Sequence, residues 1–276
     1  MDSRRMCPHC RAFITNRDKV CPYCNERVGP RAIDLRDASG LVAGLIPQAR
    51  FNTIVILLVN FGLYLASGLF SSKGGHGGFW DIDGRTLVEF GAKYGPLITL
   101  GQWWRLVTAG FLHGGMLHIL MNSWVFFDLG AEVEQIYGPS RMWVIYLVSS
   151  VCGFYVSNLW SPMVPSVGAS AGLCGLIGAM IALGMTHTGP AASMIRGQYI
   201  RWAIYLMIWS FLFPGVDIAA HAGGMAAGFG LAYFSGLPRH ERASVESLWR
   251  VAAWFGILLT ILSFLLWYLW FSRIAQ

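Results

Sequence analysis

The stretch "SVGASAGLCGLIGAM", residues 166–180, contains four glycines and no charged residue. Glycine destabilises a helix in water by roughly 1 kcal/mol relative to alanine, yet the apolar residues around these glycines indicate a helix. Small residues that recur on one face of a membrane helix let a second helix approach closely. Ser170 lies near the start of the stretch. The segment is therefore either a packing seam or a seam that carries a nucleophile.

The overall composition indicates an integral membrane protein. Apolar residues make up 55% of the 276 residues and charged residues only 12%, whereas about a quarter of the residues in an ordinary soluble domain are charged. The net charge of +6 fits loops that lie against anionic lipid. Because the sequence has no dense basic stripe, nucleic-acid binding is not expected.

Apolar segments of the length that spans a bilayer, roughly 20 residues, occur seven times. Their approximate bounds are 51–70, 114–133, 142–160, 168–186, 199–214, 218–236 and 251–271. The sequence thus predicts an all-α polytopic membrane protein with a six-span core over residues 51–236 and a linker and seventh transmembrane helix over residues 237–276. The long loop at residues 71–113 is rich in aromatic residues, so we expect it to have structure of its own at the membrane interface.

Lysine and arginine in the loops predict the orientation. The N-terminal tail and alternate loops carry arginine, whereas the loops "SPMVPS" and "FPGVD" carry no positive charge. This predicts a cytoplasmic N-terminus and an external C-terminus, in a plasma or inner membrane. The loop at residues 71–113 conflicts with this orientation, because it should be external and yet carries two lysines and two arginines.

Four polar residues fall at a similar depth in this topology. The second, fourth and sixth spans all begin at the outer face, and His118, Asn122, Ser170 and His221 lie in their first turns. At 1.5 Å per residue, all four lie roughly 5–12 Å below the outer ends of their helices. Each polar residue taken alone is more often structural, but four in one layer indicate a functional site.

A second seam lies in the sixth span, where Ala220, Gly224 and Gly228 recur every four residues. Close approach of the fourth and sixth spans would allow His221 to take a proton from Ser170. The Ser170 backbone N–H, His118 and Asn122 would then stabilise an oxyanion. Asp217 is expected to be the N-cap of the sixth span. Since no other carboxylate is an obvious partner for His221, we expect a Ser–His dyad.

These motifs together resemble the rhomboid intramembrane serine proteases. The resemblance covers roughly residues 51–236 and rests on "WWR" at 103–105, "HILMN" at 118–122, "GAEVE" at 130–134, "GAS" at 168–170 and "AHAGG" at 220–224. It implies a six-helix core with an added seventh helix, catalytic Ser170 and His221, oxyanion residues His118 and Asn122, and cleavage of transmembrane protein substrates in the lipid bilayer without a cofactor for catalysis. It also implies that Arg105 and Glu134 stabilise the fold.

Two positions depart from the family pattern. Ala171 replaces a frequent glycine, which could narrow the oxyanion site, and Cys174 replaces a frequent aromatic residue that packs on the catalytic histidine. The alternatives are a non-catalytic rhomboid-like protein that binds membrane helices and a transporter. The presence of both Ser170 and His221 disfavours the first, and the lack of repeated halves or charged pairs near the midplane disfavours the second.

The N-terminus contains "CPHC" and "CPYC", which supply Cys7, Cys10, Cys21 and Cys24. Two such pairs are typical of a structural zinc site with four thiolate ligands, and a disulfide or redox role is the alternative. We therefore predict a zinc-ribbon-like cytoplasmic domain at residues 1–30 and a linker at residues 31–50. Such a ribbon would bind a cytoplasmic protein partner or regulate the membrane core.

Overall fold

The computed structural model describes residues 4–7, 10–15, 18, 20–26, 28, 50–75, 77–213, 215–235 and 243–274. The chain divides into two compact units, Met1–Gln48 and Ala49–Gln276. The predicted linker at residues 31–50 lies outside the described residues except for Arg50, and so does the start of the linker predicted from residue 237.

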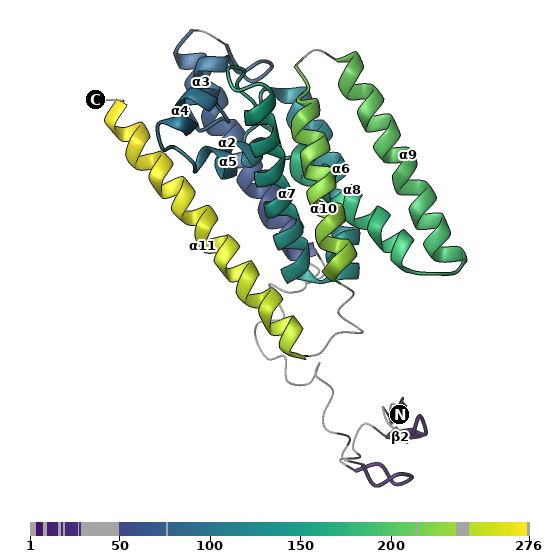
Figure 1. The fold of residues 1–276 in the computed structure, drawn as a ribbon. Helices are drawn as coiled ribbons and strands as arrows, with labels where there is room; N and C mark the ends of the chain where they lie inside the picture. The colour runs from purple at the N-terminus through teal and green to yellow at the C-terminus, as the bar shows by residue number, and fades with distance from the viewer. Residues whose placement is uncertain are drawn as a thin grey trace. The chain divides into compact units, whose positions relative to one another are not determined.

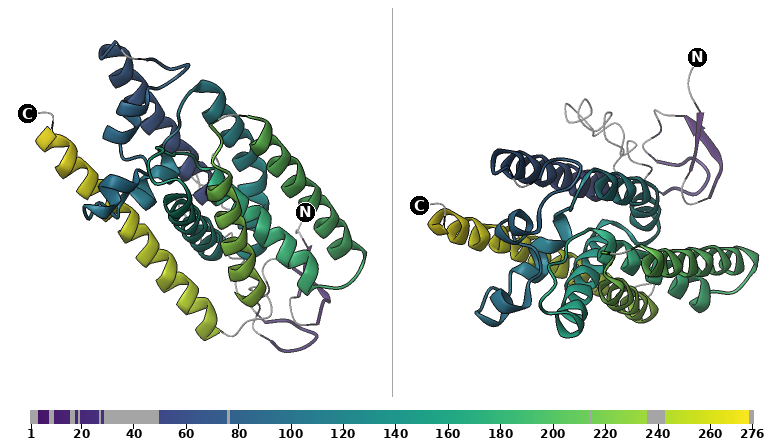
Figure 2. Two further views of the ribbon diagram at one scale, coloured as in Figure 1. Left: turned by 45° about the horizontal axis from the view of Figure 1, so that its top comes forward. Right: turned by 90° about the horizontal axis from the view of Figure 1, so that it is seen from above.

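The larger unit is built from helices, and seven of its described helices correspond to the seven predicted spans (Figure 1). They are α2 (Phe51–Lys73), α6 (Met116–Tyr137), α7 (Pro139–Trp160), α8 (Ser170–Thr186), α9 (Pro190–Leu212), α10 (Ile218–Ser235) and α11 (Ala243–Ile274). In both Figure 1 and Figure 2, α9 and α11 lie on opposite flanks of the bundle. The predicted all-α architecture is confirmed for this unit.

Hydropathy alone identifies fewer spans than the fold contains. Among the described helices, α2, α7 and α11 are long and apolar enough to cross a membrane by length and composition, and α8 is apolar but shorter. The cause differs among the remaining spans: α6 and α9 contain charged residues, whereas α10 contains none and is rich in glycine. Helix α9 begins at Pro190, earlier than the predicted start near residue 199, which lies after Arg196 because this residue interrupts the apolar pattern.

The segment between α2 and α6 is folded, as predicted. It contains α3 (Gly84–Glu89), α4 (Gly95–Thr99), α5 (Arg105–Thr108) and the 3-10 helix η2 (Ala109–Phe111). Asp83 caps α3, since its side chain accepts a hydrogen bond from the Thr86 backbone N–H (2.9 Å). Side-chain oxygens at this position commonly satisfy the free N–H groups of a helix start. The segment therefore forms a scaffold that packs beside the bundle.

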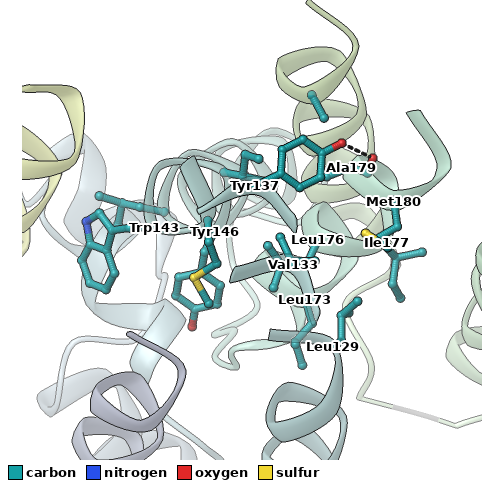
Figure 3. Close-up of a cluster of buried hydrophobic side chains, with 14 of the residues drawn as sticks. Leu129, Val133, Tyr137, Trp143, Tyr146, Leu173, Leu176, Ile177, Ala179 and Met180 are labelled. Carbon is teal, nitrogen blue, oxygen red and sulfur yellow. Dashed lines mark hydrogen bonds between the residues drawn. The ribbon is translucent and has the colours of Figure 1, made fainter. Parts of the chain in front are cut away.

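Helix α8 lies within the hydrophobic core, since nearly all of its residues from Ala171 to Gly184 are buried. Its apolar side chains pack against α6 and α7, as Figure 3 shows for Leu173, Leu176 and Ile177 beside Leu129 and Val133. At one end of this cluster, the Tyr137 hydroxyl donates a hydrogen bond to the Ala179 carbonyl (2.9 Å). Burial on all sides holds the N-terminus of α8, where Ser170 lies, in a fixed position.

The predicted seam between the fourth and sixth spans is present. A side chain at Gly224 would overlap the backbone of Ala171, and one at Gly228 would overlap the backbone of Gly175. The two backbones thus approach as closely as small residues permit. Gly172 of the quoted stretch is not part of this seam, because a side chain there would meet the Tyr146 ring on α7.

The smaller unit contains a two-stranded antiparallel sheet of β1 (Arg4–Met6) and β2 (Phe13–Thr15), with Arg5 opposite Ile14. Cys7 follows the first strand directly. The unit has its own buried cluster, whose members are Cys7, Ile14, Cys21, Val28 and, partly buried, Cys24.

Candidate functional site

Ser170 and His221 form the centre of the site. Ser170 is the first residue of α8, and its Oγ lies 2.8 Å from Nε2 of His221 on α10. Asp217 fixes the start of α10 as predicted, since its carboxylate accepts a hydrogen bond from the Ala220 N–H (2.9 Å). The second carboxylate oxygen accepts from the Ser157 hydroxyl on α7. The 2.8 Å distance between Ser170 Oγ and His221 Nε2 is the geometry that proton transfer from a nucleophile requires.

His118 faces the same point as the serine. A carbon atom built on Gly168 would lie 2.8 Å from His118 Nε2 and 3.2 Å from Ser170 Oγ. The Gly114 N–H donates to His118 Nδ1 (3.3 Å), so the ring hydrogen of a neutral His118 is on Nε2. The imidazole therefore directs an N–H donor toward the space beside Ser170.

Gly168 is held in a conformation that only glycine adopts readily. Its φ is +139°, and its N–H donates to the Ala109 carbonyl of η2 (3.0 Å). The loop segment before α8 is thereby attached to the scaffold between α2 and α6. Since α8 begins at Ser170, the unpaired N–H groups of its first turn and the positive end of its dipole also lie at the site.

Asn122 lies one turn below His118 on α6 and is buried. Its Nδ2 donates to the backbone carbonyl of His118 (2.9 Å), rather than to Ser170. The structure thus brings together Ser170, His221 and His118, whereas Asn122 supports the helix turn that carries His118. An amide nitrogen carries two hydrogens, and this bond uses one of them.

Ser210 is a third polar side chain beside Ser170 and His221, and the sequence did not single it out. Ser210 on α9 is buried, and its Oγ lies 2.9 Å from His221 Nδ1. The expected dyad is thus joined to a second hydroxyl on another helix. The sequence does place this polar residue near the outer end of the predicted fifth span. Serine is common in membrane helices, however, because its hydroxyl can bond the backbone of its own helix, so its presence alone does not indicate a site.

Lys93 is a second residue that the sequence did not single out. Its side chain is fully buried, and Nζ donates to the carbonyls of Ser161 (2.9 Å) and Val164 (2.8 Å). Burial lowers the pKa of Lys93 below its usual range, and the negative charge of Asp217 opposes this shift. The lysine therefore fastens the α7–α8 loop, which leads to Gly168 and Ser170, to the scaffold.

Arg105 and Glu134 make contacts that stabilise the fold. The guanidinium of Arg105 lies 4.7 Å from the ring centroids of both Trp104 and Trp270, and Nη1 donates to the Val88 carbonyl (2.7 Å). Cation–π contacts of this kind stabilise a desolvated arginine. Glu134 accepts hydrogen bonds from the backbone of α2, including the Thr53 N–H (3.1 Å). A carboxylate at the N-terminus of α2 also interacts favourably with the dipole of that helix.

The two departures from the family pattern are both buried in α8. Cys174 lies one turn after Ser170 and is fully buried. The Ala171 carbonyl lies against Gly224, and its methyl group lies near Gly153 of α7. Alanine is thus accommodated between α7 and α10.

The four cysteines of the smaller unit lie together, and their Sγ atoms are all within 4.8 Å of one another. Cys7 and Cys24 are 3.8 Å apart, and Cys10 and Cys21 are 3.6 Å apart. A disulfide would require about 2.0 Å, whereas a tetrahedron of thiolates at about 2.3 Å from zinc has edges of about 3.8 Å. The sulfur atoms therefore fit a zinc ion and do not form disulfides.

The described residues of the two Cys-x-x-Cys pairs have one hydrogen bond and one backbone conformation in common. In the first, the Arg11 N–H donates to the Cys7 carbonyl (3.0 Å), and in the second the Asn25 N–H donates to the Cys21 carbonyl (2.9 Å). Arg11 and Asn25 both have positive φ, +60° and +55°. Two equivalent turns that direct their sulfur atoms to a single point are a preformed metal-binding arrangement.

Comparison with known proteins identifies the larger unit. Residues 100–237, half of the chain, match the family model described as "Rhomboid domain". The matched region contains Ser170, His221, His118 and Asn122, and excludes the cysteine cluster.

Three relatives illustrate the similarity. The chain is 36% identical over 154 residues to "Rhomboid protease GluP" of Bacillus subtilis (strain 168), an alignment that covers 56% of this chain and 30% of the relative. It is 37% identical over 153 residues to "RHOMBOID-like protein 6, mitochondrial" of Arabidopsis thaliana, covering 54% and 49%. It is 34% identical over 150 residues to "Rhomboid-like protease 3" of Toxoplasma gondii, covering 53% and 57%. The chain thus spans between about a third and somewhat over half of the length of these relatives.

Proposed function

This chain belongs to the rhomboid family, and we propose that it is an intramembrane serine protease that cleaves transmembrane segments of other membrane proteins. Family membership and the apolar helices make it a multi-pass membrane protein. The observation that carries the proposal is the 2.8 Å contact between Ser170 Oγ and His221 Nε2. Relatives named as proteases add independent support.

The reaction would begin with proton transfer from Ser170 Oγ to His221 Nε2. Oγ forms a bond to the carbonyl carbon of the substrate peptide, and the electron pair of the C=O bond moves onto the oxygen. The tetrahedral intermediate collapses when the C–N bond breaks and His221 returns the proton to the leaving amine. Water, deprotonated by His221, then hydrolyses the acyl-enzyme ester and regenerates Ser170. No cofactor is needed in any of these steps.

The oxyanion would be stabilised beside Gly168. The donors proposed there are the Ser170 N–H, the His118 Nε2–H and the Asn122 amide. Each preorganised donor of this kind contributes about 3–4 kcal/mol to transition-state stabilisation. Support comes from His118 Nε2 and Ser170 Oγ, which lie on either side of one point next to Gly168, and from the dipole of α8, whose positive end is at Ser170.

We also propose the predicted orientation, with a cytoplasmic N-terminus and an external C-terminus. The cations of the segment between α2 and α6 conflicted with it in the sequence. Lys93 and Arg105 are fully buried and bond backbone carbonyls, and Arg85 pairs with Glu89 (3.0 Å). Three of the four cations are thus held within the fold of the segment, so they carry little weight in the charge rule for orientation. The fourth, Lys73, is the last residue of α2 and still counts against this orientation. Accessibility of a single cysteine placed at either terminus in intact cells tests this orientation.

The direct test of activity uses the purified chain and a test protein with one transmembrane segment. Wild type should cleave it, and the Ser170→Ala and His221→Ala proteins should not. A Ser193→Ala protein is the control, because Ser193 is an exposed serine on α9. Cleavage by the Ser170→Ala protein at the wild-type rate would overturn the mechanism. Binding of the test protein without cleavage by wild type would instead favour the alternative, a membrane-helix binding protein.

For the N-terminal unit, we propose a structural zinc held by Cys7, Cys10, Cys21 and Cys24. Four thiolates close the tetrahedron, so zinc would stabilise the fold and leave no position for catalysis. Metal analysis should give about one zinc per chain, and Cys10→Ser should lose it. Cys152→Ser, a change in α7, is the matched control. Absence of zinc from protein purified under reducing conditions would contradict the proposal. The protein partner predicted for this unit stays a prediction.

A further inference from the structure

The hydroxyl of Ser210 links three helices at the centre of the site. Of the side chains of α9, all of which the structure describes, those buried are Ala192, Tyr199 and Ser210. Ser210 Oγ lies 2.9 Å from His221 Nδ1, and His221 Nε2 lies 2.8 Å from Ser170 Oγ. A continuous hydrogen-bonded chain therefore runs from α9 through the imidazole of α10 to the first residue of α8.

The direction of each bond in this chain follows from the number of hydrogens. A serine hydroxyl has one hydrogen, and that of Ser210 is directed at the Leu206 carbonyl (2.7 Å). A carbonyl oxygen can only accept, so the Ser210 oxygen faces His221 with a lone pair. His221 Nδ1 must then supply the hydrogen between them. A neutral imidazole carries one N–H, so Nε2 is left with the lone pair that faces Ser170.

We propose that Ser210 is a positioning residue that holds His221 in the tautomer able to accept the proton of Ser170. This inference rests on the proposed protease function. A carboxylate commonly has this role in serine proteases of aqueous sites, but an ionised group is costly within a membrane. A hydroxyl whose own hydrogen is already committed to a carbonyl does the same without a charge. It also makes the catalytic tautomer depend on the position of α9.

The kinetic test compares Ser210→Ala, Ser210→Thr and, as the control on the same helix, Ser193→Ala. In the Ser210→Ala protein Nδ1–H has lost its acceptor, and the competing tautomer would place a hydrogen on Nε2, where it blocks proton transfer. We expect kcat to fall about tenfold, the effect of one such hydrogen bond, with KM nearly unchanged. Ser210→Thr retains the hydroxyl and should retain most of the activity. Ser193→Ala should match wild type.

The spectroscopic test does not depend on cleavage. Protein labelled with ¹⁵N-histidine resolves protonated from unprotonated ring nitrogens, and a His221→Gln protein identifies the His221 signals. Wild type and Ser210→Thr should show a protonated Nδ1 and an unprotonated Nε2, and Ser210→Ala should show the second tautomer or exchange between the two.

The outcomes separate the two proposals. If the Ser170→Ala protein cleaves like wild type, the proposed mechanism with Ser170 as nucleophile fails, and the tautomer of His221 still shows whether Ser210 orients the imidazole. If Ser170→Ala is inactive but Ser210→Ala matches wild type in both kcat and tautomer, the role of Ser210 is overturned and the protease function stands. A wild-type protein with the hydrogen on Nε2 also overturns it.

Discussion

Replacement of Gly168 by alanine should remove activity without unfolding the protein. Gly168 has a φ of +139°, and a carbon added to it would lie 2.8 Å from His118 Nε2 and 3.0 Å from Cε1. Carbon and nitrogen atoms that are not bonded normally stay about 3.5 Å apart. The His118 ring must therefore move away from Gly168, because the Gly168 backbone is held by its hydrogen bond to the Ala109 carbonyl.

The magnitude has two parts. The strained φ should lower the free energy of unfolding by about 1–3 kcal/mol. Displacement of His118 removes one oxyanion donor and places a methyl group where the oxyanion would form. Loss of one such donor lowers kcat by about 10²–10³-fold, so we expect at least a 10²-fold loss of cleavage.

Gly189→Ala is the matched control, since Gly189 also has a positive φ, +105°, and an added carbon there meets no atom within 4 Å. Both variants should lose similar stability in a thermal unfolding assay. Only Gly168→Ala should lose cleavage of the single-span test protein. Wild-type cleavage by a folded Gly168→Ala protein would refute the placement of the oxyanion beside Gly168.

Three further predictions concern stability, measured by thermal unfolding in detergent. Gly228→Leu should lose at least about 1–3 kcal/mol, because a Cβ atom there already overlaps the Gly175 backbone, whereas a Cβ atom at Gly230 meets no atom within 4 Å and Gly230→Leu should be tolerated better; equal stability of the two would contradict the seam. Lys93→Met should lose about 2–3 kcal/mol as two hydrogen bonds from a charged donor disappear, and an unchanged melting temperature would count against that anchor. Glu134→Gln should lose about 1 kcal/mol, because it weakens the cap of α2; an unfolding curve identical to that of wild type would contradict this role of Glu134.

Much of the fold could be predicted because its determinants are local. Apolar length locates the helices, and small residues spaced by four predict the seam on which Gly224 and Gly228 meet α8. Asp217 before an apolar run predicts an N-cap. The two Cys-x-x-Cys pairs predict a metal cluster, because their spacing alone brings the thiols of one turn together.

Part of the site could not be predicted, because it depends on which helix lies beside which. The similar depth predicted for Ser170 and His221 is consistent with their 2.8 Å contact. Ser210 lies in the same layer, but nothing in the sequence indicates that α9 directs it at His221 Nδ1. Lys93 looks like an ordinary loop cation until its burial and its bonds to the α7–α8 loop are known. The oxyanion role of Asn122 stays a prediction, and the hydrogen bond from its Nδ2 to the His118 carbonyl could not be foreseen from the sequence.

The identity of the nucleophile is the central claim, and covalent trapping tests it most directly. The purified chain would be treated with a fluorophosphonate, which phosphonylates an activated serine, and the labelled peptide identified by mass spectrometry. We expect one adduct per chain, on Ser170, and no adduct in the His221→Ala protein. Labelling of Ser210 or any other serine, or equal labelling of Ser170 in the absence of His221, would contradict it.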